Sequence, residues 1–89
     1  MCAGSYAGTY SGTANGVVIA TLHADGTLET RFVTGGIEAT GVVAESGAIT
    51  GSGDGIYFDG AIAFSSCAMS GDWANTATGL AGTWQMARQ

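Results

Sequence analysis

The sequence contains no proline and no lysine, and only 10% of its 89 residues are charged. Soluble domains usually carry about 25% charged residues. Arg31 and Arg88 are the only strong bases against seven acidic residues, which gives a formal net charge of −5. A nucleic-acid partner requires cations that replace the counterions of the phosphates, so we expect no nucleic-acid binding.

Long hydrophobic runs are also missing. No stretch approaches the roughly 18 apolar residues of a membrane helix, so we expect no membrane span. The first ten residues show neither the basic start nor the apolar run of a signal peptide. Cys2, followed by Ala3 and Gly4, is either an ordinary cysteine or the first residue of a mature lipoprotein. Either the chain is cytoplasmic or a signal was removed from it, and we favour a location outside the cytoplasm (periplasmic, secreted or lipid-anchored).

What is present is glycine, at 16 positions, together with 46% hydrophobic residues. That hydrophobic content argues against disorder. The length predicts one domain over residues 1–89 with a small core.

Turn signals such as Asn15-Gly16, Asp25-Gly26 and Asp54-Gly55 recur about every 8–12 residues, which is typical of all-β folds. The segments between the turns predict eight strands, over Ser5–Thr13, Val17–Ala24, Thr27–Thr34, Ile37–Ala44, Ala48–Ser52, Ile56–Phe64, Met69–Trp73 and Leu80–Ala87.

Successive side chains of a strand point to opposite faces, so alternation assigns an inner and an outer face. The predicted inner face carries Tyr6, Tyr10, Leu28, Phe32, Ile37, Val43, Ile49, Ile56, Phe58, Ile62, Phe64, Met69, Trp73, Leu80, Trp84 and Met86. The outer face is only weakly polar, since it includes Ala7, Val18, Ala20, Val33, Val42, Ala44, Ala61, Ala63 and Ala81. Such a surface favours contact with a partner or with a second copy.

The segment 17–24 does not alternate. A two-residue Asp25-Gly26 turn would pair His23 with Leu28, which places His23 on the inner face. Val17, Ile19 and Thr21 would follow it inward, with Thr21 beside Thr30. A longer loop would reverse this assignment.

Inward-facing glycines permit sharp coiling of the sheet. We therefore predict an antiparallel up-and-down meander that closes into a small eight-stranded barrel, with a two-sheet β-sandwich as the alternative.

The segment "GSGDGIYFDG", residues 51–60, raises the question of a calcium loop. It lacks the tandem repeats and the spaced acidic residues of known calcium motifs, so we interpret Asp54-Gly55 as a hairpin turn and predict no metal site. His23 is the only histidine, no Gly-x-Ser-x-Gly elbow occurs, and the carboxylates face outward or lie in turns. We therefore predict no enzyme activity and no cofactor.

Two further features remain open. Cys2 and Cys67 are expected at the same end of the barrel, where they are either two thiols or a disulfide reached by a free N-terminal arm. The aromatic residues of the inner face are either core or the lining of a pocket for an apolar small molecule. That pocket would be lined by Tyr6, Tyr10, His23, Phe32, Phe58, Trp73 and Trp84.

Ala7-Gly8-Thr9-Tyr10 is echoed by Ala81-Gly82-Thr83-Trp84, and Ser70-Gly71-Asp72-Trp73 has the same character. With these motifs the chain resembles the glycine-rich β-meander of uncharacterised bacterial envelope and secreted proteins, and more faintly lipocalin and avidin barrels. The resemblance implies a fold and no functional residues. From the sequence we expect a non-catalytic structural or protein-interaction module that self-associates, with binding of an apolar ligand inside the barrel as the alternative.

Overall fold

The computed structural model describes residues 2–89, which form eight antiparallel strands and no helix. The strands are β1 (Gly4–Gly12), β2 (Gly16–Leu22), β3 (Thr27–Phe32), β4 (Ile37–Val43), β5 (Ala48–Gly53), β6 (Ile56–Ala63), β7 (Ala68–Asn75) and β8 (Leu80–Arg88). No helix within these residues is long and apolar enough to cross a membrane.

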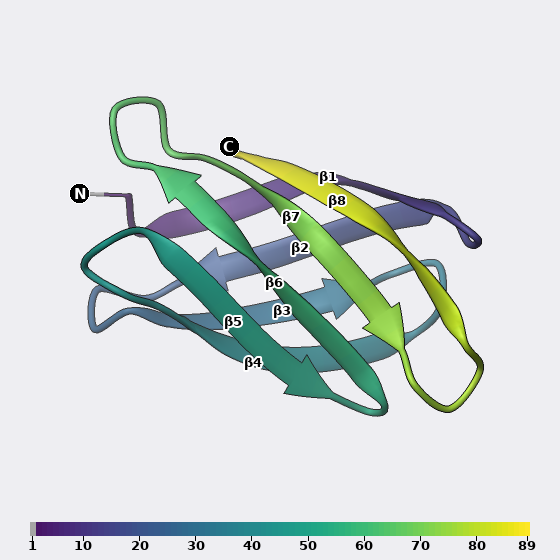
Figure 1. Cartoon of the computed structure of the whole chain (residues 1–89). Coiled ribbons are helices and arrows are strands. Elements are labelled where there is room, and N and C mark those ends of the chain that lie inside the picture. Colours follow the sequence, from purple (N-terminus) through teal and green to yellow (C-terminus); the bar gives the residue numbers. More distant parts are fainter. Residues whose placement is uncertain (1) are drawn as a thin grey trace.

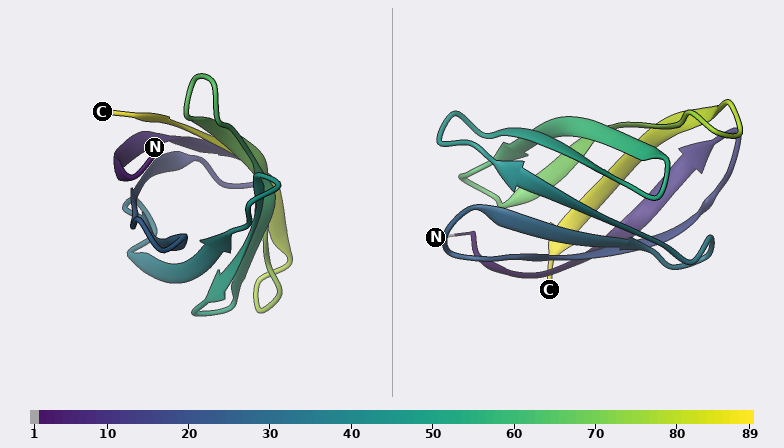
Figure 2. Two further views of the ribbon diagram at one scale, coloured as in Figure 1. Left: turned by 90° about the vertical axis from the view of Figure 1, so that its left-hand side faces the viewer. Right: turned by 90° about the horizontal axis from the view of Figure 1, so that it is seen from below.

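Each strand pairs with the next one along the chain, and β8 pairs with β1 (Figure 1). The last contact runs from Tyr6 opposite Arg88 to Gly12 opposite Gly82 and closes the ring that Figure 2 shows end-on. Closure removes the free edge strands that would otherwise recruit other sheets. The prediction of an up-and-down barrel is confirmed, and the alternative of a sandwich is wrong.

Burial follows the predicted alternation on most strands. Tyr6, Leu28, Ile49 and Met69 are almost fully buried inside the barrel. Ile37, Val43 and Leu80 are only partly buried, because they lie at the ends of their strands. Phe64 was expected inside but is 40% exposed, because β6 ends at Ala63 and Phe64 begins the loop to β7.

The predicted facing of β2 is wrong. Val18, Ala20 and Leu22 point inward, whereas Val17, Ile19, Thr21 and His23 lie outside. Val18 and Ala20, expected on the outer face, therefore belong to the core.

The loop between β2 and β3 explains this reversal. The backbone N–H of His23 donates to the carbonyl of Thr27, so three residues, 24–26, form the loop instead of two. Leu22 then faces Leu28, and Ala20 instead of Thr21 faces the buried Thr30. One added loop residue thus exchanges the two faces of the whole strand.

Close strand packing by glycine shapes the barrel wall. Gly60 and Gly71 face each other across β6 and β7, and a Cβ at Gly71 would overlap the backbone carbonyl of Asp59. Trp84 covers this region from within, and its indole N–H donates to the carbonyl oxygens of Asp59 at 3.2 Å and Asp72 at 3.0 Å. Glycine therefore supplies the curvature, and an aromatic side chain satisfies the backbone that glycine leaves uncovered.

Candidate functional site

The aromatic residues predicted to line an interior pocket form a packed cluster. Tyr10 contacts Phe32 with ring centroids 5.1 Å apart and Trp73 at 5.6 Å, and Phe58 contacts Trp84 at 6.1 Å, all edge to face. Such pairs add to the stability gained from burial alone. The Trp73 indole N–H also donates to the Ser11 carbonyl at 3.1 Å. These rings have a structural role as core, and binding of a ligand among them stays a prediction.

Tyr6, also in the predicted lining, is buried toward the other end of the barrel. Its hydroxyl donates to the carbonyl oxygen of Cys2. Burial raises the pKa of this hydroxyl, and the positive charge of Arg88 opposes the shift. The group therefore stays a neutral hydrogen-bond donor at physiological pH and ties the N-terminal arm to the core.

His23 is separated from these six aromatic residues by the barrel wall. Its ring is exposed and pairs with Glu29, which lies on the same outer face. Within residues 2–89 no hydroxyl or thiol hydrogen-bonds to this ring. The pair therefore has no attached nucleophile of the kind that acyl-transfer chemistry needs.

The segment 51–60 contains the predicted hairpin turn. Gly53 faces Ile56 across the turn, and Asp54 and Gly55 have φ angles of 49° and 83°, as a two-residue type I′ turn requires. Asp59 is exposed on the outer face, as expected. Among residues 2–89 no three side chains of the His, Cys, Asp or Glu type are grouped so that they could hold a metal ion.

Cys2 and Cys67 are joined in a disulfide, with Cα atoms 5.4 Å apart. Cys2 precedes β1, and the short arm before Gly4 reaches the loop between β6 and β7. Of the two possibilities that the sequence left open, the disulfide is the one that forms. Both residues are buried. A lipid at Cys2 would use the same sulfur atom, so the disulfide and lipid attachment at this residue exclude each other.

The outer face of β2 and the residue that follows β3 carry exposed aliphatic side chains, two of which were predicted to face inward. Val17, Ile19 and Val33 expose 46%, 41% and 42% of their surface, and we refer to them as the apolar ridge. They are neighbours, because the Val33 N–H donates to the Val17 carbonyl and Ile19 lies two residues further along β2. Aliphatic side chains gain nothing from such exposure, so the ridge is a candidate contact surface.

A groove of about 710 Å³ runs beside the ridge over the outer face of β6, β7, β8 and β1. We refer to it as the alanine groove, because its outward-facing lining is Ala7, Thr9, Ala61, Ala63, Ala68, Ser70, Gln85 and Ala87. The small side chains create the hollow between neighbouring strands. Ala7 of the groove lies opposite Ile19 of the ridge, so the two features are adjacent.

Neither feature itself contains a charged residue, and charge lies at their edges: Arg31 is opposite Ile19, and Asp59 and Asp72 adjoin the groove along β6 and β7. The sequence predicted an apolar outer face that correctly included Ala7, Val33, Ala61 and Ala63. The ridge was missed because Val17 and Ile19 were predicted to face inward. The length of the loop that follows Leu22 is the signal that would have found them.

Searches against protein-family models, curated proteins and solved structures find no match to this chain.

Proposed function

We propose that this chain is a non-catalytic protein-interaction module that self-associates through the apolar ridge and the alanine groove. The observation that carries the proposal is that the exposed aliphatic ridge lies directly beside an uncharged hollow lined mostly by small side chains. Contiguous exposed apolar surface of this kind is uncommon on monomers and marks contact sites.

The two features suit a symmetric dimer. In a two-fold dimer the same patch is used by both copies, so the ridge of each copy can enter the groove of the other. A standard interface needs about 800 Å² from each partner, a modest share of the 4708 Å² surface of this chain.

Charge supports this choice of contact surface. The net charge of −5 would repel a second copy if acidic side chains met across the interface. Because the ridge and groove are uncharged, the acidic residues stay at the rim or on other faces, where solvent screens them.

The disulfide supports a setting outside the cytoplasm. Disulfides persist in oxidising compartments and are rare in the cytosol, where thiols are kept reduced.

Sedimentation velocity from micromolar to millimolar protein tests the proposal with a matched pair of variants. Val17→Asp puts a charge into the ridge and should weaken dimerisation by about 2 kcal/mol or more, roughly 30-fold. Val42→Asp is the control, because Val42 is 57% exposed on β4 beside Thr50, outside the ridge and groove. Wild-type protein that stays monomeric at millimolar concentration, or equal weakening by both variants, would contradict the proposal.

A further inference from the structure

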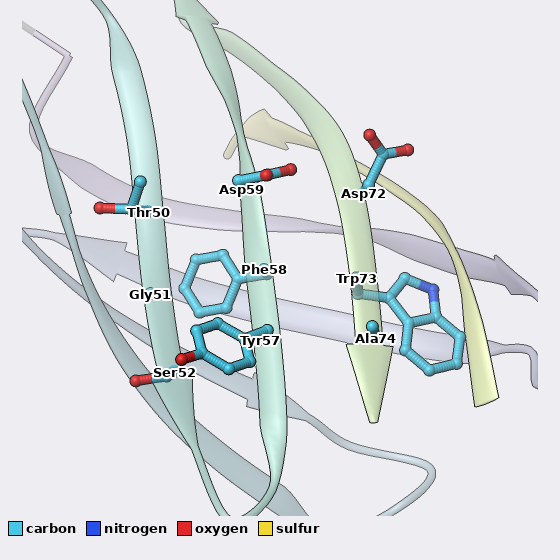
Figure 3. A pocket seen from close by; sticks show the side chains of 9 residues that line it. All are labelled: Thr50, Gly51, Ser52, Tyr57, Phe58, Asp59, Asp72, Trp73 and Ala74. Atoms are coloured by element: carbon cyan, nitrogen blue, oxygen red, sulfur yellow. The ribbon is translucent and has the colours of Figure 1, made fainter. Parts of the chain in front are cut away.

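A second depression lies on the outer face of β5, β6 and β7, where it adjoins the alanine groove along β6 and β7 (Figure 3). Its volume is about 510 Å³, and no residue lines both hollows. The outward-facing side chains in it are Thr50, Ser52, Tyr57, Asp59, Asp72 and Ala74.

Tyr57 is the feature that the fold does not explain. It sits in a strand whose outer neighbours are small, with Ser52 opposite on one side and Ala74 opposite on the other. The side chain is 64% exposed, the highest value among the large hydrophobic residues that the structure describes on the surface. Figure 3 shows its ring reaching across toward Ser52 on β5. Most of this aromatic side chain is therefore open to solvent at the edge of a depression.

Polar groups without protein partners surround the ring. Asp59 and Asp72 are direct cross-strand partners, and within residues 2–89 neither carboxylate makes a hydrogen bond or an ion pair. The hydroxyls of Thr50 and Ser52 likewise have no partner there. Like charges placed directly opposite destabilise a sheet, so the fold gains nothing from this pair. The carboxylates are strong acceptors left available for a ligand that carries hydrogen-bond donors.

From this geometry we infer that the Tyr57 depression is a binding site for a sugar ring of a neutral oligosaccharide. The C–H face of a pyranose stacks on the open face of Tyr57, because an aromatic ring carries partial negative charge on its faces. The ring hydroxyls donate to Asp59 and Asp72, and the hydroxyls of Thr50 and Ser52 can donate or accept at the edge. Each group of the depression thus meets a matching group of one ligand.

A cationic ligand fits the same place less well. The depression is open, so solvent and salt weaken both an ion pair to the carboxylates and a cation over the ring. An ammonium group also lacks the flat C–H face that would cover the exposed ring of Tyr57. Stacking combined with several hydrogen bonds to a neutral ligand is weakened far less by salt than an ion pair is.

Two-dimensional ¹H–¹⁵N NMR titration of the full chain with cellohexaose and chitohexaose, each to millimolar concentration, tests the inference. We expect the backbone amide signals of residues 50–59 and 72–74 to shift with at least one of the two. Tyr57→Ala should reduce the affinity at least tenfold, and Tyr57→Phe should retain it because the ring face remains. Phe64→Ala is the matched control, since it removes an aromatic ring that is 40% exposed in the loop between β6 and β7.

Hexalysine is titrated in parallel. The inference is overturned if neither oligosaccharide shifts these signals, if Phe64→Ala weakens binding as much as Tyr57→Ala, or if only hexalysine binds. In the last case binding would vanish in the Asp59→Asn, Asp72→Asn double variant and in high salt, which would identify a cationic partner instead. Val17→Asp should bind the oligosaccharide as wild type does, so this result is independent of the proposed self-association.

Discussion

The space around individual glycines determines where this sheet can bend. Gly71 tolerates no side chain, because the backbone of β6 occupies the place of its Cβ atom. Gly35 differs, since a Cβ there would make only ordinary contacts, at 3.7 Å to Ile37 and 3.8 Å to the Tyr10 hydroxyl. Its φ angle is also outside the left-handed region. The same residue type therefore has a packing role at one position and none at the other.

We predict that Gly71→Ala destabilises the barrel by about 1–3 kcal/mol, because β6 and β7 must separate to admit the methyl group. Gly35→Ala should change stability by less than about 1 kcal/mol and could even stabilise, since alanine restricts the unfolded chain. Chemical denaturation monitored by tryptophan fluorescence measures both values. Similar losses in the two variants would show that backbone freedom, and not close packing, explains the glycine at position 71.

Among the elements, the hairpins show which structural features local sequence patterns predict and which they do not. Strand positions, turns and the inner face of seven strands follow from glycine pairs and from alternation, which are local signals. The facing of β2 did not, because Val17, Val18 and Ile19 give no alternation and the loop length decides. A three-residue loop ending in Gly26, with φ of 93°, was as compatible with the sequence as a two-residue turn.

The candidate sites were less predictable than the strands. Val17 and Ile19 of the ridge depend on the facing of β2 and were therefore assigned to the wrong side of the wall. Tyr57 lies on the outer face, and its exposure depends on the small residues at positions 52 and 74, which lie on neighbouring strands. Cross-strand register determines both features, and it follows from the sequence only where the turn is clear, as at Asp54-Gly55, and not where the loop length is ambiguous, as after Leu22.

The loop between β2 and β3 should also make the stability of the fold sensitive to acid. The Thr27 N–H donates to the Asp25 carboxylate at 2.9 Å and holds the pKa of that carboxyl below its ordinary value of 3.8. A pKa that is lower in the folded state stabilises the fold above the unfolded value, and this contribution is lost as pH falls through the folded pKa. We expect the loss below about pH 4.

Asp25→Asn measures this contribution. The asparagine side chain can still accept the hydrogen bond from Thr27 but does not titrate, so the melting temperature of the variant should fall less than that of wild type between pH 6 and pH 3. Calorimetry across this range gives both curves. Parallel curves would mean that the loop carboxylate contributes nothing to acid sensitivity.

For the whole molecule, closure joins the two ends of the chain. β1 and β8 are the first and last strands, and their pairing must form against the entropy of almost the entire chain. The Cys2–Cys67 disulfide works in the same direction, because it fixes the arm before β1 to the loop that precedes β7. Once that bond exists, the start of β1 is held near the start of β7. Only β8 then has to fit between these two strands to close the barrel.

We therefore predict that the disulfide is a major source of stability. The bridged residues are 65 positions apart, and a loop of that length restricts the unfolded chain by about 4 kcal/mol in the chain-entropy model. Small domains have total stabilities of roughly 5–15 kcal/mol, so the double variant Cys2→Ser, Cys67→Ser should unfold at much lower denaturant concentration. Wild-type protein under reducing conditions should behave like the variant, because the constraint rather than the sulfur atoms provides the effect. A loss below about 1 kcal/mol in both would show that β1–β8 pairing alone holds the ends together and that the unfolded chain is already compact.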